Sequence, residues 1–265
     1  MTGSRGGAAP RVSFDRVADA YDRTRALPER TMRRVLELLR AELAGPGRCL
    51  EIGVGSGRLA LPLHDADIPM AGVDVSPAML ARLREKTGGA WPFPIALADA
   101  TALPFPQGSM GAGLAAHVLH VIADWTAALR ELARVVRPGG VILIDVGNWG
   151  GKGEWATLRD RFCEEAGIRR PFVGTQDPAE VGEYMGSLGA ACRVLPPIRE
   201  TISVTAEEQI SSLEEGLYSF TWQLDDQARR AAAARTRNWA RDHMGPLDVP
   251  RRRVRRIVWR AYDLP

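Results

Sequence analysis

Cysteine is scarce in this chain, and long apolar runs are absent. The cysteines (Cys49, Cys163 and Cys192) number three, without metal-ligand or CxxC spacing, which is typical of a reducing compartment. No stretch approaches the ~18 apolar residues that a membrane span needs, and the N-terminus lacks the apolar core of a signal peptide. We therefore expect a cytoplasmic protein without a membrane span.

Lysine is scarcer still, and the positive charge is weak. The net charge is +3, from 35 basic and 32 acidic residues, and Lys86 and Lys152 are the only lysines. The skew toward arginine, together with 27 glycines, is typical of GC-rich coding DNA rather than of selection for phosphate contacts. Nucleic acid is therefore not an expected partner.

The pattern from residue 49 to 146 predicts one α/β domain. The chain has 265 residues, of which 45% are hydrophobic and 25% charged, and this excludes disordered and fibrous classes. Short apolar runs alternate with helical stretches, which indicates a doubly wound, mostly parallel sheet with helices on both faces. The predicted strands are Cys49–Ile52, Met70–Val73, Ile95–Ala98, Gly113–His117 and Val141–Val146. The predicted helices are 14–25, 29–43, 58–64, 78–86 and 125–136.

After residue 147 the alternation changes. We expect helices over 154–166 and 178–188, then a strand over 191–204 with a turn near Pro196–Pro197. A helical stretch over 206–243 is too long for a simple connection and predicts a cap on the sheet. Residues 254–262 fit a closing strand with arginines at its solvated end.

The segment CLEIGVGSGR (49–58) carries a glycine loop, which we define as Gly53, Gly55 and Gly57. A tight turn from strand to helix needs glycine, and glycine also lets the backbone approach a ligand. The helix N-terminus then offers N–H groups to an anion. The dinucleotide fingerprint GxGxxG would need a sixth-position glycine where this chain has Arg58, so a nicotinamide oxidoreductase is disfavoured.

Acidic residues accompany the strands around this loop. Glu51 lies inside an apolar strand, where a carboxylate is rare unless it is paired, so a functional role is favoured. Asp74 ends the next strand, 21 residues after Gly53, where an acidic side chain can accept hydrogen bonds from ribose hydroxyls. Asp99 follows a further strand.

Six segments in order resemble the class I S-adenosylmethionine-dependent methyltransferases, in particular the ubiquinone/menaquinone-type C-methyltransferases and small-molecule enzymes. The segments are FDRVADAYD, EIGVGSGR, GVDVS, LADATALPFPQGS, HVLHVIADW and ELARVVRPGGVILI, within residues 14–146. The resemblance implies a Rossmann-like, seven-stranded sheet. Together with the residue pattern, the expected fold has N-terminal helices and a helical cap inserted before the last strand. The resemblance also implies S-adenosyl-L-methionine as cofactor and S-adenosyl-L-homocysteine as product.

The expected organisation is a single domain over residues 1–265. Its expected parts are N-terminal helices (12–44), a cofactor-binding core (48–147), further helices and a strand (148–204), the cap (205–249) and a final strand (250–265). We expect a monomer or a homodimer.

The resemblance assigns one group of residues to the methionine and ribose of the cofactor. Glu51 and the glycine loop would wrap these groups, and Asp74 would hold the ribose hydroxyls. Tyr21 would close over the sulfonium, because an aromatic face attracts a cation. Arg25 would pair with the methionine carboxylate.

A second group is assigned to the adenine. Val75 and Met79 would lie against the ring, and Asp99 and Ala100 would meet its edge. His117 is placed among the cofactor contacts as well.

His117 and His120 are the candidate catalytic residues. They lie at the carboxyl end of the fourth predicted strand, where ligands bind in open α/β sheets. The ordinary pKa of histidine, about 6.5, suits a general base, which is needed only if the acceptor loses a proton. The alternatives are that both histidines line the pocket or cap the next helix, and that no base is used.

Four residues are predicted to form the acceptor pocket. Asn148 and Trp149 belong to a loop after the fifth strand, and Tyr218 and Trp222 would share a helical face at spacing i, i+4. The alternative for the second pair is docking of the cap on the sheet. No metal site is expected, because Asp145 and Asn148 have no evident third ligand.

The predicted function is methyl transfer to O, N or C of a small, partly apolar metabolite. The alternatives are an RNA-directed methyltransferase and a non-catalytic S-adenosylmethionine-binding partner protein. The fourth strand does not end in the [DN]-P-P-[YF] motif of amino-directed nucleic-acid enzymes, which counts against the first alternative.

Overall fold

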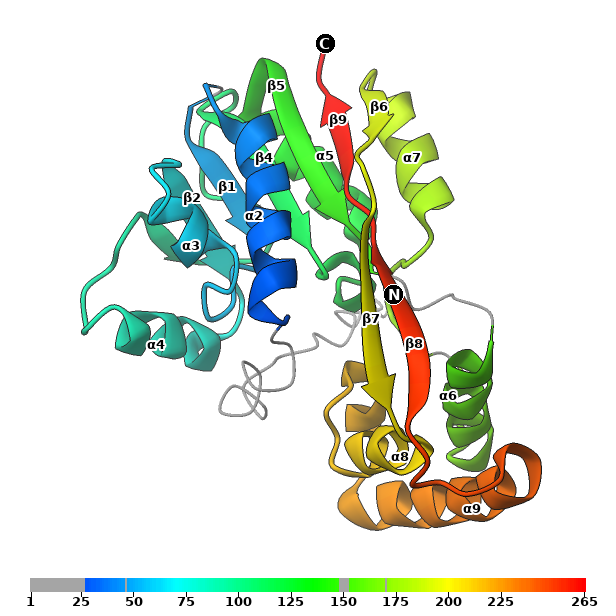
Figure 1. Cartoon of the computed structure of the whole chain (residues 1–265). Coiled ribbons are helices and arrows are strands. Elements are labelled where there is room, and N and C mark those ends of the chain that lie inside the picture. Colours follow the sequence, from blue (N-terminus) through cyan, green and yellow to red (C-terminus); the bar gives the residue numbers. More distant parts are fainter. Residues whose placement is uncertain (1–26, 46, 148–152, 170) are drawn as a thin grey trace, which may run out of the picture.

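The computed structural model of the chain describes residues 27–45, 47–147, 153–169 and 171–265 (Figure 1). The predicted helix over 14–25 lies outside the described residues, as do the candidate site residues Tyr21, Arg25, Asn148 and Trp149. No helix in the described ranges is long and apolar enough to cross a membrane.

The centre of the fold is a seven-stranded sheet with the order β3-β2-β1-β4-β5-β9-β6. Strands β3, β2, β1, β4 and β5 are parallel, whereas β9 is antiparallel to both of its neighbours. The prediction of a doubly wound, mostly parallel seven-stranded sheet is therefore confirmed. The strands are β1 (Cys49–Ile52), β2 (Met70–Asp74), β3 (Ile95–Leu97), β4 (Met110–Ala116), β5 (Val136–Asp145), β6 (Ala191–Val194) and β9 (Arg260–Asp263).

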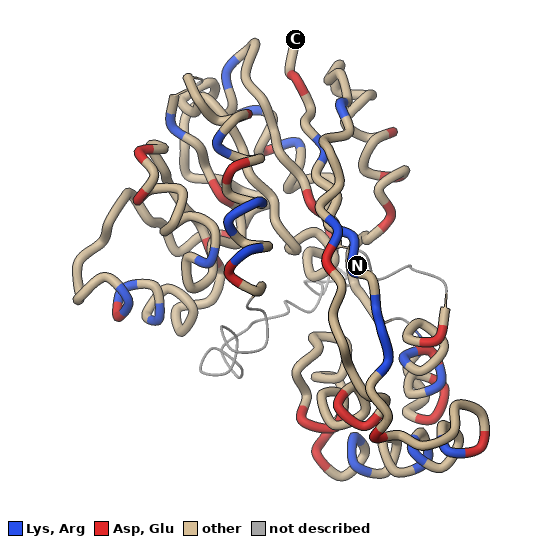
Figure 2. The backbone as a smooth tube through the Cα atoms, viewed as in Figure 1, with Lys and Arg blue, Asp and Glu red and all other residues tan. Residues whose placement is uncertain are grey.

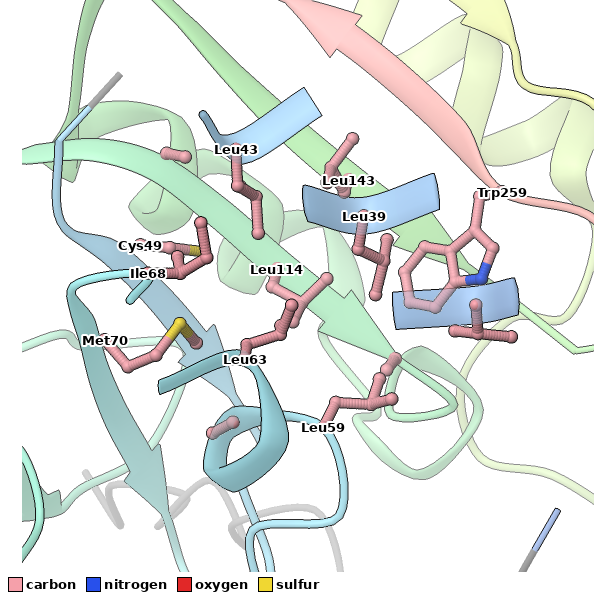
Figure 3. Close-up of a cluster of buried hydrophobic side chains, with 14 of the residues drawn as sticks. Leu39, Leu43, Cys49, Leu59, Leu63, Ile68, Met70, Leu114, Leu143 and Trp259 are labelled. Atoms are coloured by element: carbon pink, nitrogen blue, oxygen red, sulfur yellow. The ribbon is translucent and has the colours of Figure 1, made fainter. Parts of the chain in front are cut away.

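Helices cover both faces of this sheet. The first face packs against α2 (Glu29–Leu43), α3 (Ala60–His64) and α4 (Pro77–Lys86), and the second against α5 (Trp125–Val135) and α7 (Pro178–Ser187). Neighbouring residues of β1 alternate between the faces, since Cys49 belongs to the first core cluster and Leu50 to the second. Figure 3 shows the first cluster, in which side chains of α2 meet those of β4, β5 and Trp259.

The predicted closing strand is wrong in one respect, because it is two strands. Residues Arg251–Ile257 form β8, which pairs antiparallel with β7 (Ile198–Val204), and only β9 joins the main sheet. The predicted strand over 191–204 divides in the same way into β6 and β7. Backbone pairing continues across the break, where Leu195 N–H donates to the Trp259 carbonyl at 3.0 Å. The two chain segments leave the sheet together and form a ribbon that leads to the cap (Figure 1).

The cap has its own core. It contains α8 (Ala206–Glu214), the 3-10 helix η3 (Ser219–Gln223) and α9 (Asp226–Met244), so the single predicted helical stretch is three helices. Helix α6 (Glu154–Glu165) also belongs to it, because Leu158 and Phe162 are buried in the same cluster as Ile210 and Phe220. The cap therefore includes a helix that precedes the predicted boundary at residue 205.

Candidate functional site

The glycine loop follows β1 and adopts a conformation that only glycine takes readily. The φ angles of Gly53, Gly55 and Gly57 are 67°, 55° and 79°. A Cβ atom on Gly53 would lie 2.4 Å from Cγ2 of Val118, and one on Gly57 would lie 2.7 Å from Cγ of Leu61. The first contact shows that the loop after β1 packs against the segment after β4.

Asp74 ends β2 and holds the glycine loop in place. Its Oδ2 accepts a hydrogen bond from Gly55 N–H at 2.8 Å, and its Oδ1 accepts one from Ser76 N–H at 2.8 Å. Both bonds are charge-assisted, which makes them stronger than neutral ones. The structure thus brings Asp74 beside the loop, as predicted from its spacing; its role toward a ribose stays a prediction.

Glu51 lies on β1 with an exposed fraction of 3%, and its Oε2 has no hydrogen-bond partner among the described residues. Burial raises the pKa of Glu51 to about 8, against the opposing effects of the Arg58 charge and the Ala60 N–H group. Buried polar atoms in native proteins are normally hydrogen-bonded. An orphaned carboxyl oxygen beside a glycine loop therefore points to a ligand with a donor group.

Replacing Glu51 by glutamine should stabilise the unliganded protein, and more so at higher pH. Because the folded pKa is raised, Glu51 keeps its proton on folding, and stability falls as the pH rises from the ordinary pKa of glutamate toward 8. The gain in unfolding free energy should grow by roughly 2–4 kcal/mol between pH 5 and pH 8. Urea unfolding of both proteins at the two pH values measures it, and an equal gain at both would contradict the burial of a neutral carboxyl.

The residues predicted to meet adenine follow β2 and β3. Met79 and Ala100 are buried, whereas Val75 has an exposed fraction of 39% for an apolar side chain. Asp99 Oδ1 accepts hydrogen bonds from Thr101 N–H at 2.9 Å and from Thr101 Oγ1 at 2.8 Å. Because β1, β2 and β3 are parallel neighbours, these residues and the glycine loop lie along one edge of the sheet.

His117 forms a dyad with Asp145 at the ends of β4 and β5. Its Nε2 lies 3.1 Å from Asp145 Oδ2, and its backbone N–H donates to the Asp145 carbonyl at 2.9 Å. The predicted strand end is one residue too late, because β4 ends at Ala116 and His117 has a φ of 51°. A non-glycine residue in this region costs free energy and often marks a functional site.

Asp145 is a buried carboxylate that stays ionised. Burial raises the pKa of Asp145. The charge and hydrogen bond of His117 and the N–H of Gly147 lower it by more, so the net pKa lies below the ordinary range. The Gly147 N–H donates to Oδ1 at 2.9 Å, while Oδ2 faces the imidazole. A carboxylate held in this way fixes the orientation of the ring.

The second candidate, His120, lies in a different environment. It is buried in the short helix η2 (Leu119–Val121) and meets the ring of Phe172 edge-on, with centroids 5.4 Å apart. His120 is thus part of the packed interior after β4. Its role as a base stays a prediction.

The expected helical pairing of Tyr218 and Trp222 is wrong. Tyr218 has extended backbone (φ −111°, ψ 133°) and precedes η3, a 3-10 helix with about three residues per turn. Trp222 Nε1 donates to the carbonyl of Gly216 at 2.7 Å, whereas Tyr218 stacks on Phe220 with centroids 5.8 Å apart. Whether either ring contacts an acceptor stays a prediction.

Three further residues belong to this region and were not predicted as site residues. Asp145 could have been found, because it ends β5, the strand beside β4, and His117 directly follows β4. Arg58 had served only to exclude a dinucleotide site, yet its charge acts on both Glu51 and Asp145. Phe172 lies on an irregular segment without a sequence signal.

No group of three His, Cys, Asp or Glu side chains within the described ranges is placed to hold a metal ion.

The family comparison and the curated relatives point to methyltransferases. Residues 50–144 match the family model described as a methyltransferase domain. The chain is 31% identical over 187 residues to a malonyl-[acyl-carrier protein] O-methyltransferase of Halorhodospira halophila, covering 65% of this chain and 63% of the relative. It is 35% identical to a demethylmenaquinone methyltransferase of Thermus thermophilus, covering 49% of this chain and 62% of the relative. The chain therefore spans less than two thirds of either relative.

The fold is shared with solved structures. The YcgJ protein of Bacillus subtilis superimposes with a TM-score of 0.61 at 19% identity, covering 90% of this chain and 100% of that one. At this identity the similarity shows the fold alone.

Proposed function

We propose that the protein transfers the methyl group of S-adenosylmethionine to O, N or C of a small, partly apolar acceptor. The match of residues 50–144 to the family model described as a methyltransferase domain supports this. The observation that carries the proposal is the glycine loop flanked by Glu51 and Asp74 at the carboxyl edge of the sheet. The proposal concerns the activity of this chain, and the substrates of the relatives are not transferred to it.

The described residues fit the cofactor. The loop needs glycine because Cβ atoms on Gly53 and Gly57 would collide with Val118 and Leu61. The orphaned oxygen of Glu51 suits the ammonium group of a methionine moiety. Asp74 would hold the ribose hydroxyls while it keeps its bonds to the loop. Val75, Met79, Asp99 and Ala100 would surround the adenine.

When bound, S-adenosylmethionine supplies the methyl group and the leaving group. The chain has to orient the acceptor, exclude water and accept a proton where the acceptor carries one. His117 suits the last task, because its Nε2 is directed at Asp145 and its Nδ1 makes no hydrogen bond to a described residue. The proton would pass from the acceptor to Nδ1, and Asp145 would stabilise the resulting imidazolium.

We place the enzyme in the cytoplasm, as a monomer or a homodimer. Support for the compartment comes from Cys49, Cys163 and Cys192, which are all free thiols in the structure.

The test is transfer of a tritiated methyl group from S-adenosylmethionine to a panel of phenols, quinols, amines and carboxylic acids. We expect label in at least one acceptor, with release of an equal amount of S-adenosylhomocysteine. Tight cofactor binding without transfer to any acceptor would favour the non-catalytic alternative. Binding to bulk tRNA that weakens steeply with salt would favour the RNA-directed alternative.

A further inference from the structure

The ribbon between the sheet and the cap carries an arginine with unusual surroundings. Arg253 lies half-buried on β8, in the basic run that Figure 2 shows between the two parts of the molecule. Its Nη1 donates to Gln209 Oε1 at 3.4 Å, and its guanidinium carbon lies 5.9 Å from the ring centroid of Trp155. Tyr218 donates to the same Gln209 oxygen at 3.4 Å. The guanidinium is thus surrounded by polar and aromatic side chains.

Its neighbours on the same face of the strand have acidic partners. Arg251 and Arg255 alternate with Arg253 and share its face, and they form ion pairs with Glu154 and Glu200 respectively. Arg253 makes no ion pair with any carboxylate in the described part of the chain. The expectation that these arginines lie at a solvated strand end holds for Arg252 and Arg256, whereas Arg251, Arg253 and Arg255 are partly buried.

The charge of Arg253 is costly where it stands. Burial lowers the pKa of Arg253, and the positive charges of Arg255 and Arg159 lower it further, while Tyr218 acts in the opposite direction. Arginine nevertheless remains charged in proteins. A partly buried charge without a counter-ion is unfavourable, and an anion bound beside it would remove the cost through charge-assisted hydrogen bonds.

A row of aromatic rings connects this place with the segment after β4. Tyr218 stacks on Phe220, Phe220 meets Phe172, and Phe172 meets His120, with centroid separations of 5.8, 5.8 and 5.4 Å. The row begins at Tyr218, which shares the side-chain oxygen of Gln209 with Arg253. It ends at His120, which follows His117 by three residues in the sequence. Phe220 and His120 are buried, whereas Tyr218 and Phe172 are partly exposed. An apolar molecular body can therefore contact the partly exposed rings while its polar end meets the guanidinium.

We propose that Arg253 binds an oxyanion of the acceptor, a carboxylate or a phosphate, whose apolar body contacts the partly exposed rings of Tyr218 and Phe172. This inference rests on the proposed function, because it specifies the acceptor of that site as an amphiphilic anion. It makes Arg253 a residue that determines substrate specificity and takes no part in the transfer of the methyl group.

The test is binding of octanoate, octyl phosphate and uncharged octanamide, measured by calorimetry with and without S-adenosylhomocysteine. We expect at least one anion to bind roughly tenfold or more tightly than octanamide, and the tighter of the two anions identifies the oxyanion. Arg253→Gln should abolish this preference and leave the affinity for octanamide unchanged. Arg252→Gln is the matched control on the exposed face of the same strand, and it should keep the preference.

Arg253→Lys keeps the charge but not the planar fork, so it should retain an intermediate preference. Thermal unfolding verifies that each variant is folded. Equal binding of anions and amide by the unchanged protein, no binding of either anion, or a preference that survives Arg253→Gln would overturn the inference. A preference that depends on Arg253 in a protein that fails to bind S-adenosylhomocysteine would instead contradict the proposed function alone.

Discussion

Replacing His117 by alanine should lower kcat by about 10²–10⁴-fold for any acceptor that loses a proton on methylation, which is the usual contribution of a general base. The reason is geometric: the imidazole is held by Asp145 at 3.1 Å and stands at the end of β4 with a φ of 51°. The affinity for S-adenosylhomocysteine should change much less. Initial rates of both enzymes between pH 6 and pH 9 measure the effect.

Two further variants test the partner of His117 and provide a control. Asp145→Asn keeps the shape but removes the charge that stabilises the imidazolium, so it should lower kcat without changing the KM for the cofactor. His243→Ala removes an exposed histidine of the cap, whose Nδ1 lies 2.8 Å from the Trp239 carbonyl, and it should leave the rate unchanged. A His117→Ala enzyme that keeps the full rate at every pH would remove His117 as the base.

Asp74→Ala should weaken binding of S-adenosylhomocysteine about 10–100-fold, since hydrogen bonds to a charged group contribute about 1.5–3 kcal/mol. The substitution removes the bonds that hold Gly55 and Ser76 at 2.8 Å, in addition to those proposed for the ribose. Calorimetric titration of both proteins gives the ratio of the affinities.

A cofactor analogue without ribose hydroxyls separates these two contributions. If Asp74 binds the ribose, the analogue should bind the unchanged protein more weakly than S-adenosylhomocysteine, and this difference should vanish in Asp74→Ala. The same loss of affinity in both proteins would leave Asp74 with a role in the loop alone.

The parts of the site that were predictable depend on short stretches of sequence. The glycine loop follows directly from the spacing of three glycines after a strand, and Asp74 follows from the position at which the next strand ends. Because parallel strands end at one edge of the sheet, these residues had to lie close together. The same reasoning applies to the dyad, although Asp145 was considered only as a metal ligand.

The errors concern contacts between distant segments. The division of the closing strand depends on pairing of residues 198–204 with 251–257, and nothing within either stretch indicates where a strand leaves one sheet for another. The absence of an acidic partner for Arg253 likewise depends on where Glu154 and Glu200 lie. For Tyr218 and Trp222, five residues are too few for periodicity to distinguish a 3-10 helix from an α-helix.

The most direct test of the account is titration of the purified protein with S-adenosylhomocysteine. We predict saturable binding at a single site with micromolar affinity, weakened by Asp74→Ala. Absence of binding by both S-adenosylhomocysteine and S-adenosylmethionine would contradict the account, because the glycine loop, Glu51 and Asp74 would then serve another ligand.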